Sequence, residues 1–174
     1  MLDRRVLLVA ALSTLLFAPS AVRGDDVADL KATFEQATAA LNKQDLDALL
    51  AFYHDDYTGF GVIAPFLIKG KEALRAVLQP LFATRESTTI IPFEPEYRVI
   101  DSTGVVQSYF AATVKPKGGP AATSSARATL TYVKTNGRWL LVASHLSRIP
   151  SGEKSSLARR AGPRRAHVSS RATS

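Results

Sequence analysis

The 174-residue sequence contains no cysteine. This absence excludes a disulfide framework, a thiol nucleophile and thiolate ligands for a metal ion. It also excludes the cysteine through which an exported lipoprotein is anchored.

The sequence also lacks an apolar run long enough for a comfortable membrane span, which takes about 20 residues. Its most apolar segment, residues 6–18, follows the charged residues 3–5 and precedes small residues near Gly24. A charged start, a short apolar run and a small-residue end form the three-part pattern of a secretory signal peptide. We therefore predict a signal peptide over residues 1–24, and a periplasmic or secreted protein with no transmembrane segment after signal removal. An uncleaved membrane anchor is the alternative.

The part of the chain that we expect to fold has a formal net charge of zero. The whole sequence has a formal net charge of +7, but residues 25–150 carry as many basic as acidic side chains. A nucleic-acid-binding domain concentrates basic charge on its folded surface, so no specific nucleic-acid partner is expected. Residues 151–174 are rich in Ser, Ala and Arg and poor in large apolar residues, which predicts a basic disordered tail.

The first half of the mature chain has helical patterning. Apolar residues recur every three or four positions over residues 27–41, which predicts a first helix. Asp45 is placed to cap a short second helix over residues 46–53. A third helical pattern covers residues 69–81, where Pro80 predicts a kink or an early stop.

The second half changes to strand-like alternation. Pro92 and Pro95 predict that their strand is an edge or bulged strand, and Asn136-Gly137 predicts a hairpin turn. Helices followed by antiparallel strands indicate an α+β domain over residues 25–150. The expected strands are residues 57–63, 87–100, 105–115, 125–134 and 139–149.

Five short segments mark this order of elements. The first helix ends in AALN at residues 39–42, and DLDAL at residues 45–49 opens the second. FYHDDY at residues 52–57 leads into a strand, GKEAL at residues 70–74 opens the third helix, and the chain closes on GRWLLVASHLS at residues 137–147. As an ordered set, these segments resemble the SnoaL-like branch of the nuclear transport factor 2-like superfamily.

The resemblance implies a cone, in which a curved antiparallel sheet wraps around the long N-terminal helix, with two further short helices. It also implies a pocket inside the cone and a homodimer. Members of the superfamily include ketosteroid isomerases, polyketide cyclases, dehydratases and domains that only bind or assemble. The fold alone therefore does not define the activity.

Ketosteroid isomerases need a carboxylate base and an oxyanion hole made by a tyrosine and a protonated aspartic acid. On the shared landmarks, the tyrosine falls on Ala37, the base near Gly61 and the second acid near Thr129. No acid occurs over residues 57–69. The resemblance therefore implies the cone without isomerase chemistry.

His145 is the candidate catalytic residue. Two-residue alternation along the last strand places Trp139, Leu141, Ala143, His145 and Ser147 on one face. A histidine there is able to act as a general acid or base near neutral pH. A packed, hydrogen-bonded histidine is the alternative, and Trp139 is expected in the core.

The candidate ligand pocket comes from two neighbouring strands. Gln107 and Tyr109 share a face of one strand, and Arg127 and Thr129 share a face of the next. If these faces point into the cone, they form a mixed pocket in which Arg127 favours an anionic group. In the opposite phase they lie on an outer or dimer surface, and the interior is apolar. That apolar set is Val106, Phe110, Ala112, Val114, Leu130 and Tyr132.

No metal site or cofactor is expected. His54, Asp55 and Asp56 have suitable ligand types, but side chains of three consecutive residues diverge. Three hypotheses remain for the function. They are an exported domain that binds a small, partly apolar molecule in its cone, a cyclase, hydrolase or dehydratase that uses His145, and a dimeric structural module with no ligand. Whether the chain is an enzyme stays open.

Overall fold

The computed structural model describes residues 24–149. The predicted signal peptide, apart from Gly24, and the predicted tail over residues 151–174 lie outside the described residues. The elements, in chain order, are α1 (Gly24–Asn42), α2 (Leu46–Leu50), β1 (Tyr53–Phe60), β2 (Ile68–Lys69), α3 (Gly70–Thr84), β3 (Arg85–Ile100), β4 (Thr103–Pro116), β5 (Ala122–Thr135) and β6 (Arg138–Arg148).

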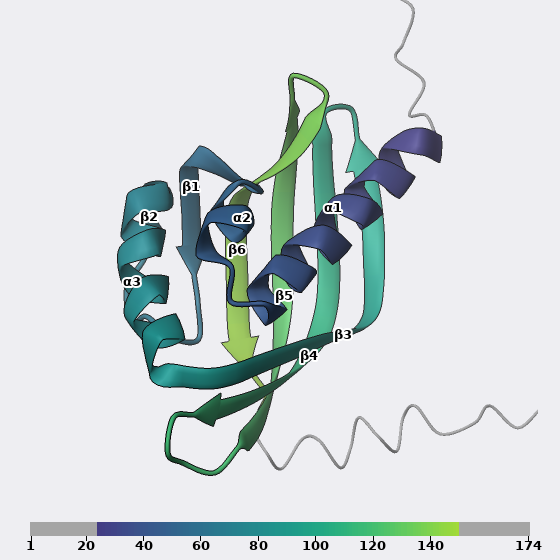
Figure 1. Ribbon diagram of the computed structural model, residues 1–174. Helices are drawn as coiled ribbons and strands as arrows, with labels where there is room; N and C mark the ends of the chain where they lie inside the picture. The colour runs from purple at the N-terminus through teal and green to yellow at the C-terminus, as the bar shows by residue number, and fades with distance from the viewer. Residues whose placement is uncertain (1–23, 150–174) are drawn as a thin grey trace, which may run out of the picture.

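All six strands form one curved sheet in the order β2-β1-β6-β5-β4-β3. Neighbouring strands are antiparallel except β1 and β6, which are parallel. Figure 1 shows α1 crossing the inner face of this sheet, with α2 and α3 beside β1. The predicted α+β class, with a sheet curved around the long first helix, is confirmed.

The core lies between α1 and the inner face of the sheet. Leu30 and Phe34 of α1 are 0% and 2% exposed. The Phe34 ring lies 5.9 Å from the ring of Tyr97 on β3 and 6.1 Å from the ring of Phe110 on β4. Trp139 is buried in the same cluster, as predicted.

Local sequence signals account for the edge position and the bulge of β3 and for the last hairpin turn. β3 is an edge strand, and its pairing with β4 shifts register between Phe93 and Glu96, around Pro95. A proline has no N–H to donate to a ladder, so an edge position and a bulge both accommodate it. Asn136 and Gly137 have φ angles of 51° and 76°, as a two-residue hairpin turn requires.

Several predicted element ends are wrong, among them those of the first strand, which runs from Tyr53 to Phe60 rather than over 57–63, and the early stop considered at Pro80. The second helix ends at Leu50 because the following residues pair with β6, where Tyr53 lies opposite Leu141. The third helix does not stop at Pro80 but continues to Thr84. The side chains of its last turn include Phe82, which packs against the core and holds that turn in place.

β6 contains a β-bulge that its sequence alternation does not reveal. Its pairing with β5 passes from Ala143 directly to Leu141, which leaves Val142 as an extra residue. A bulge of one residue reverses the faces of everything that follows it. Trp139 is therefore buried inside while His145 is exposed outside, and the predicted sharing of one face by these two residues is wrong.

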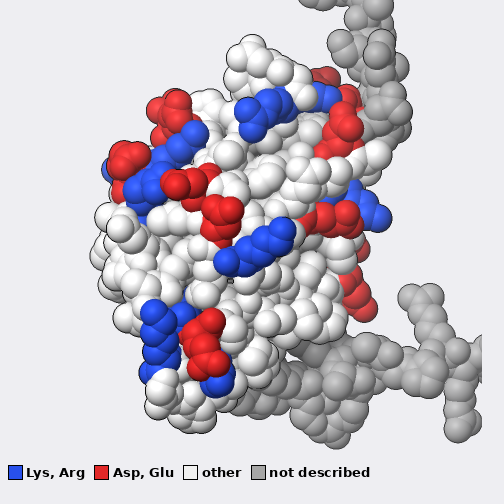
Figure 2. Space-filling view, viewed as in Figure 1, with Lys and Arg blue, Asp and Glu red and all other residues white. Residues whose placement is uncertain are grey.

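Charged side chains of both signs are interspersed over the helix-bearing face (Figure 2). This agrees with the equal numbers of basic and acidic residues in the expected domain. Within residues 24–149, no helix is both long and apolar enough to cross a membrane.

Candidate functional site

A cavity of about 310 Å³ lies between the helices and the inner face of the sheet. All three helices contribute to its wall, together with β1, β3, β4, β5 and β6. The wall is mostly apolar, and seven aromatic rings line it: Phe34, Phe52, Tyr53, Tyr57, Phe82, Phe110 and Tyr132. The interior of the cone is therefore hollow, which small-molecule sites generally require.

The cavity wall contains no Asp, Glu or His among the described residues. Ala37 and Gly61 both line it, so the positions matched to the isomerase tyrosine and base face the interior without a functional group. Thr129 is exposed on the opposite face, and Leu130 lines the cavity in its place. None of the three residues supplies an acid or a base there.

One buried hydroxyl pair interrupts the apolar wall. The hydroxyl of Tyr57 lies 2.7 Å from that of Ser144, and both residues line the cavity. Burial raises the pKa of Tyr57, so its hydroxyl stays protonated at neutral pH. Two hydroxyls sharing one hydrogen bond leave one O–H able to donate to a ligand oxygen.

Gly59 makes room for this pair. It lies opposite Ser144 in the pairing of β1 with β6. A Cβ atom at Gly59 would stand 2.0 Å from the Tyr57 hydroxyl oxygen and 2.7 Å from the Ser144 hydroxyl oxygen. The absence of a side chain at this position therefore lets the Tyr57 ring lie along the strand and reach Ser144.

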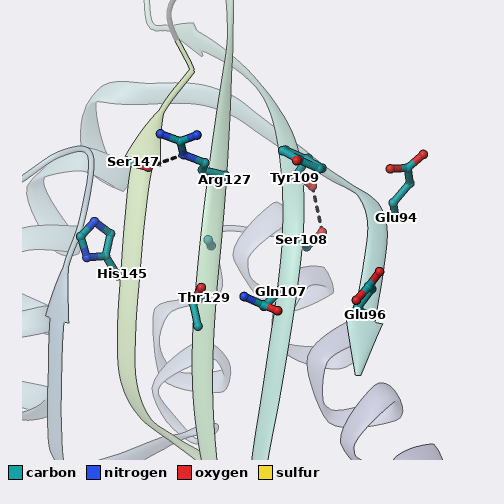
Figure 3. Close-up of a pocket in the computed structure, with 10 residues that line it drawn as sticks. Glu94, Glu96, Gln107, Ser108, Tyr109, Arg127, Thr129, His145 and Ser147 are labelled. Carbon is teal, nitrogen blue, oxygen red and sulfur yellow. Dashed lines mark hydrogen bonds between the residues drawn. The ribbon is translucent and has the colours of Figure 1, made fainter. Parts of the chain in front are cut away.

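The five predicted site residues come together, but outside the cone. Figure 3 shows the sheet with the helices behind it and the polar side chains of β4, β5 and β6 on the near side. The outer groove is lined by His145, Gln107, Tyr109, Arg127 and Thr129, with Glu94, Glu96, Ser108, Ala128 and Ser147. The apolar faces of β4 and β5 thus point into the cone, and their polar faces point outward.

Strand register explains how these residues meet. His145 pairs with Thr129, and Thr129 pairs with Gln107, across β6, β5 and β4. The next row holds Arg127 opposite Tyr109. These side chains form two parallel rows on an open surface, where Tyr109 is 40% exposed.

Arg127 and His145 are exposed in the outer groove and make few contacts there. Arg127 donates from Nε to the Ser147 hydroxyl at 3.1 Å. The His145 ring lies 5.9 Å from the ring of Phe60 on β1. The groove offers a guanidinium cation, an imidazole, an amide and hydroxyl groups to a polar partner. The roles of the five residues as site residues stay predictions.

Polar residues of the cavity that the sequence did not single out include Tyr57, Ser144, Arg85 and Arg148. Two of them, Ser144 and Arg148, face inward because of the bulge at Val142. Strict alternation from the buried Trp139 would put both on the outer side. The preference of large apolar residues for the interior was the available signal for the correct phase of β4 and β5.

The His54 segment makes local contacts. The backbone N–H of Asp56 donates to Nδ1 of His54 at 3.1 Å. The carboxylate of Asp55 pairs with the Lys71 ammonium at 2.8 Å, and this pairing lowers the pKa of Asp55. The part of the chain that the structure describes holds no group of three or more His, Cys, Asp or Glu residues able to bind a metal.

Solved structures with the same architecture come from several bacteria. A candidate scytalone dehydratase from Novosphingobium aromaticivorans has a TM-score of 0.67 at 15% identity, over 72% of this chain and 85% of that chain. A ketosteroid isomerase-like protein from Erwinia carotovora atroseptica has a TM-score of 0.64 at 22% identity, over 74% and 99%. A protein of unknown function with a cystatin-like fold from Nostoc punctiforme has a TM-score of 0.62 at 21% identity, over 74% and 95%. At these identities the likeness concerns the fold alone.

No curated protein sequence matches this chain. The family model described as a SnoaL-like domain matches residues 30–152, which is more than half of the sequence. The curved sheet, the hollow interior and this match agree, and the chain belongs to the SnoaL-like family of the nuclear transport factor 2-like superfamily.

Proposed function

We propose that the mature chain is an exported domain that binds a small, partly apolar molecule inside its cone. The observation that carries the proposal is the aromatic-lined cavity of about 310 Å³. Ligand pockets are mostly apolar and use a few placed polar groups to fix orientation. The Tyr57–Ser144 pair is such a group.

The driving force for binding is burial of the apolar part of the ligand. Each 100 Å² of apolar ligand surface removed from water contributes roughly 2.5 kcal/mol. Part of that gain is offset by the lost freedom of the ligand. Chemistry of the ketosteroid isomerase type is not part of the proposal, because the cavity wall holds no carboxylate among the described residues.

Filling the cavity tests the proposal. Ala112 lines the cavity from β4, whereas the neighbouring Ala111 does not. A wild-type protein that binds a neutral bicyclic probe, 2-naphthylmethanol, should melt at higher temperature in its presence. Ala112→Leu should remove this stabilisation and Ala111→Leu should keep it. No stabilisation in wild type, or equal stabilisation in both variants, would contradict binding inside the cone.

A His145-dependent enzyme of the cyclase, hydrolase or dehydratase kind is the second candidate. It is favoured by the grouping of His145 with Arg127 and Tyr109 in one groove. Its site would lie on the outer face, away from the cavity. His145 does not line the cavity, so His145→Ala should leave the affinity for 2-naphthylmethanol unchanged. A loss of that affinity would indicate that the probe binds at the outer face instead.

We also propose that this outer face contacts a second copy of the chain. Ile91, Phe93 and Tyr109 are 50%, 49% and 40% exposed there, and Phe93 pairs with Tyr109 across β3 and β4. Glu96 and Arg127 line the same groove, and opposite charges on one face suit a twofold contact. Sedimentation equilibrium should give a dimer for wild type and a monomer for Phe93→Lys/Tyr109→Lys. Phe66→Lys, which changes a ring that is 58% exposed elsewhere, is the control.

Export is part of the proposal because of the leader pattern. Cleavage near Gly24 predicts a mature protein that begins at about Asp25. Mass spectrometry of the protein recovered from the periplasm or the medium of an expressing bacterium measures this directly. A full-length mass in the cytoplasmic fraction would contradict export.

A further inference from the structure

We propose that the molecule bound in the cone carries a carboxylate, which Arg85 and Arg148 hold at the cavity while an apolar ring system fills the interior. This inference rests on the proposed function and adds the charge and chemical class of the ligand. The observation behind it is that the charged side chains lining an otherwise uncharged wall are both guanidinium groups.

Arg85 is brought to the cavity by the junction of α3 and β3. It is the first residue of β3 and is partly exposed, so its guanidinium has access to both the cavity and water. Burial lowers the pKa of Arg85, because part of the hydration of its charge is lost. The group nevertheless remains charged, since arginine is protonated at any physiological pH.

Arg148 is brought to the cavity by the bulge at Val142. Without the extra residue, strict alternation from Trp139 would place Arg148 on the outer face. With it, Arg148 shares the inner face with Ser144 and lines the cavity as the exposed last residue of β6. Two unrelated features of the fold therefore deliver a guanidinium to the same cavity.

Neither arginine has an ion-pair partner within residues 24–149, although other basic side chains there do. Glu86 follows Arg85 directly, but it pairs with Lys115 at 2.6 Å. Arg75 on α3 pairs with Asp47 at 2.8 Å. Arg85 has lost part of its hydration without gaining a counter-ion among the described residues, so it is poised to gain free energy from an anion. Arg148 is exposed and adds a second guanidinium without an ion-pair partner at the same cavity.

The geometry of the guanidinium groups and the apolar rest of the wall indicate which kind of anion fits the cavity. A guanidinium offers a rigid fork of donors that matches a carboxylate with two parallel hydrogen bonds. The rest of the wall is aromatic and aliphatic, and aromatic rings prefer ring partners in stacked or edge-to-face contact. A carboxylic acid with a cyclic apolar body satisfies both parts of the cavity.

The test compares two probes with the same ring system, 2-naphthoate and the neutral 2-naphthylmethanol. Titration calorimetry on the wild-type protein should show 2-naphthoate binding more tightly by about tenfold or more. Arg85→Gln/Arg148→Gln should remove this preference and leave the affinity for 2-naphthylmethanol within about twofold. Arg98→Gln/Arg138→Gln removes the same number of positive charges from residues that do not line the cavity, and it should keep the preference.

The outcomes separate this inference from the proposed function. Equal binding of both probes to wild type, or an unchanged preference in Arg85→Gln/Arg148→Gln, overturns the carboxylate assignment while binding in the cone stands. Failure of both probes to bind overturns the proposed function as well. If the double variant does not fold, salt titration of wild type decides, since added KCl should weaken 2-naphthoate binding and not 2-naphthylmethanol binding.

Discussion

At the scale of single residues, Asn42 connects the end of α1 to the edge strand. Its amide accepts a hydrogen bond from the Ile90 N–H at 2.6 Å and donates one to the Ile90 carbonyl at 3.0 Å. Both backbone groups of Ile90 are thereby satisfied by one side chain. An edge strand exposes such groups, and covering them protects it.

Asn42→Ala should lower the free energy of unfolding by about 1–3 kcal/mol, because it leaves two part-buried backbone groups without partners. Urea denaturation measures the loss. Lys43→Ala, at the exposed neighbouring position, should change stability by less than about 0.5 kcal/mol. Equal midpoints for the two variants would show that the Asn42 bridge contributes nothing.

Gly59→Ala should destabilise the protein and weaken the proposed binding of a ligand in the cone. The new methyl group collides with the Tyr57 hydroxyl, which must leave Ser144 and move into the cavity. Loss of a buried hydrogen bond costs about 1–3 kcal/mol. Gly61→Ala is the matched control, since the nearest atom to its Cβ lies 3.9 Å away, and an equal loss of stability in this control would contradict the explanation.

At the scale of elements, α1 packs tightly against β4 at Gly104. A Cβ atom there would stand 2.8 Å from a methyl carbon of Leu30 and 3.2 Å from the Trp139 ring. Leu30 is fully buried, so it has little room to move. The position of the helix on the sheet therefore depends on the missing side chain at this glycine.

Gly104→Ala should cost about 1–3 kcal/mol of stability by overpacking this contact. Leu30→Val removes the colliding carbons, so Leu30→Val/Gly104→Ala should lose less than the sum of the two single losses. Thermal denaturation of the four proteins in the cycle measures the coupling. Additive losses would mean that the helix does not touch β4 at this point.

The elements differ in how far sequence predicts them. The edge position of β3 and the Asn136-Gly137 turn were predictable, because both depend on the local backbone. Proline cannot donate to a strand ladder, and Asn-Gly readily adopts the positive φ angles of a hairpin turn. The bulge at Val142 was not, because it arises where β6 pairs with β1 on one side and β5 on the other. That one residue placed His145 outside and Arg148 inside. The sequence predicted that Gln107 shares a face with Tyr109 and Arg127 with Thr129, but it left open on which side of the sheet they lie.

At the scale of the whole molecule, buried tyrosines make stability depend on alkaline pH. Burial raises the pKa of Tyr53, Tyr57 and Tyr132 above the ordinary value of 10.0. Below that value both the folded and the unfolded chain keep these protons, so these groups give stability no pH dependence. Above it the unfolded chain releases protons that the folded chain retains, and stability falls as pH rises.

The free energy of unfolding should therefore decline from about pH 10 upward, by up to roughly 1.4 kcal/mol per pH unit for each such tyrosine. Urea titrations from pH 8 to pH 11 measure the slope. Tyr132→Phe removes one of the three groups and should make the decline shallower. A slope that stays the same in this variant would contradict a buried, protonated Tyr132.

The general shape was readable from the order of helices and strands and from the family resemblance, and the hollow interior followed from that shape. Whether the cavity wall is polar or apolar could not be predicted from the sequence, because it depends on which face of β4 and β5 points toward α1. Large apolar residues such as Val106 and Tyr132 occupy the inner phase, and the polar residues were left to the outer groove. Two separate candidate sites result, one on each face of the same sheet.

The most direct test of which face binds the ligand is an NMR titration of methyl groups with 2-naphthoate. Binding in the cone predicts shifts at the methyl groups of Val77, Ala112 and Leu130, which line the cavity. It also predicts little change at Ala111 and at Thr129 of the outer groove. Shifts confined to Ala111 and Thr129 would place the ligand on the outer face and contradict binding in the cone.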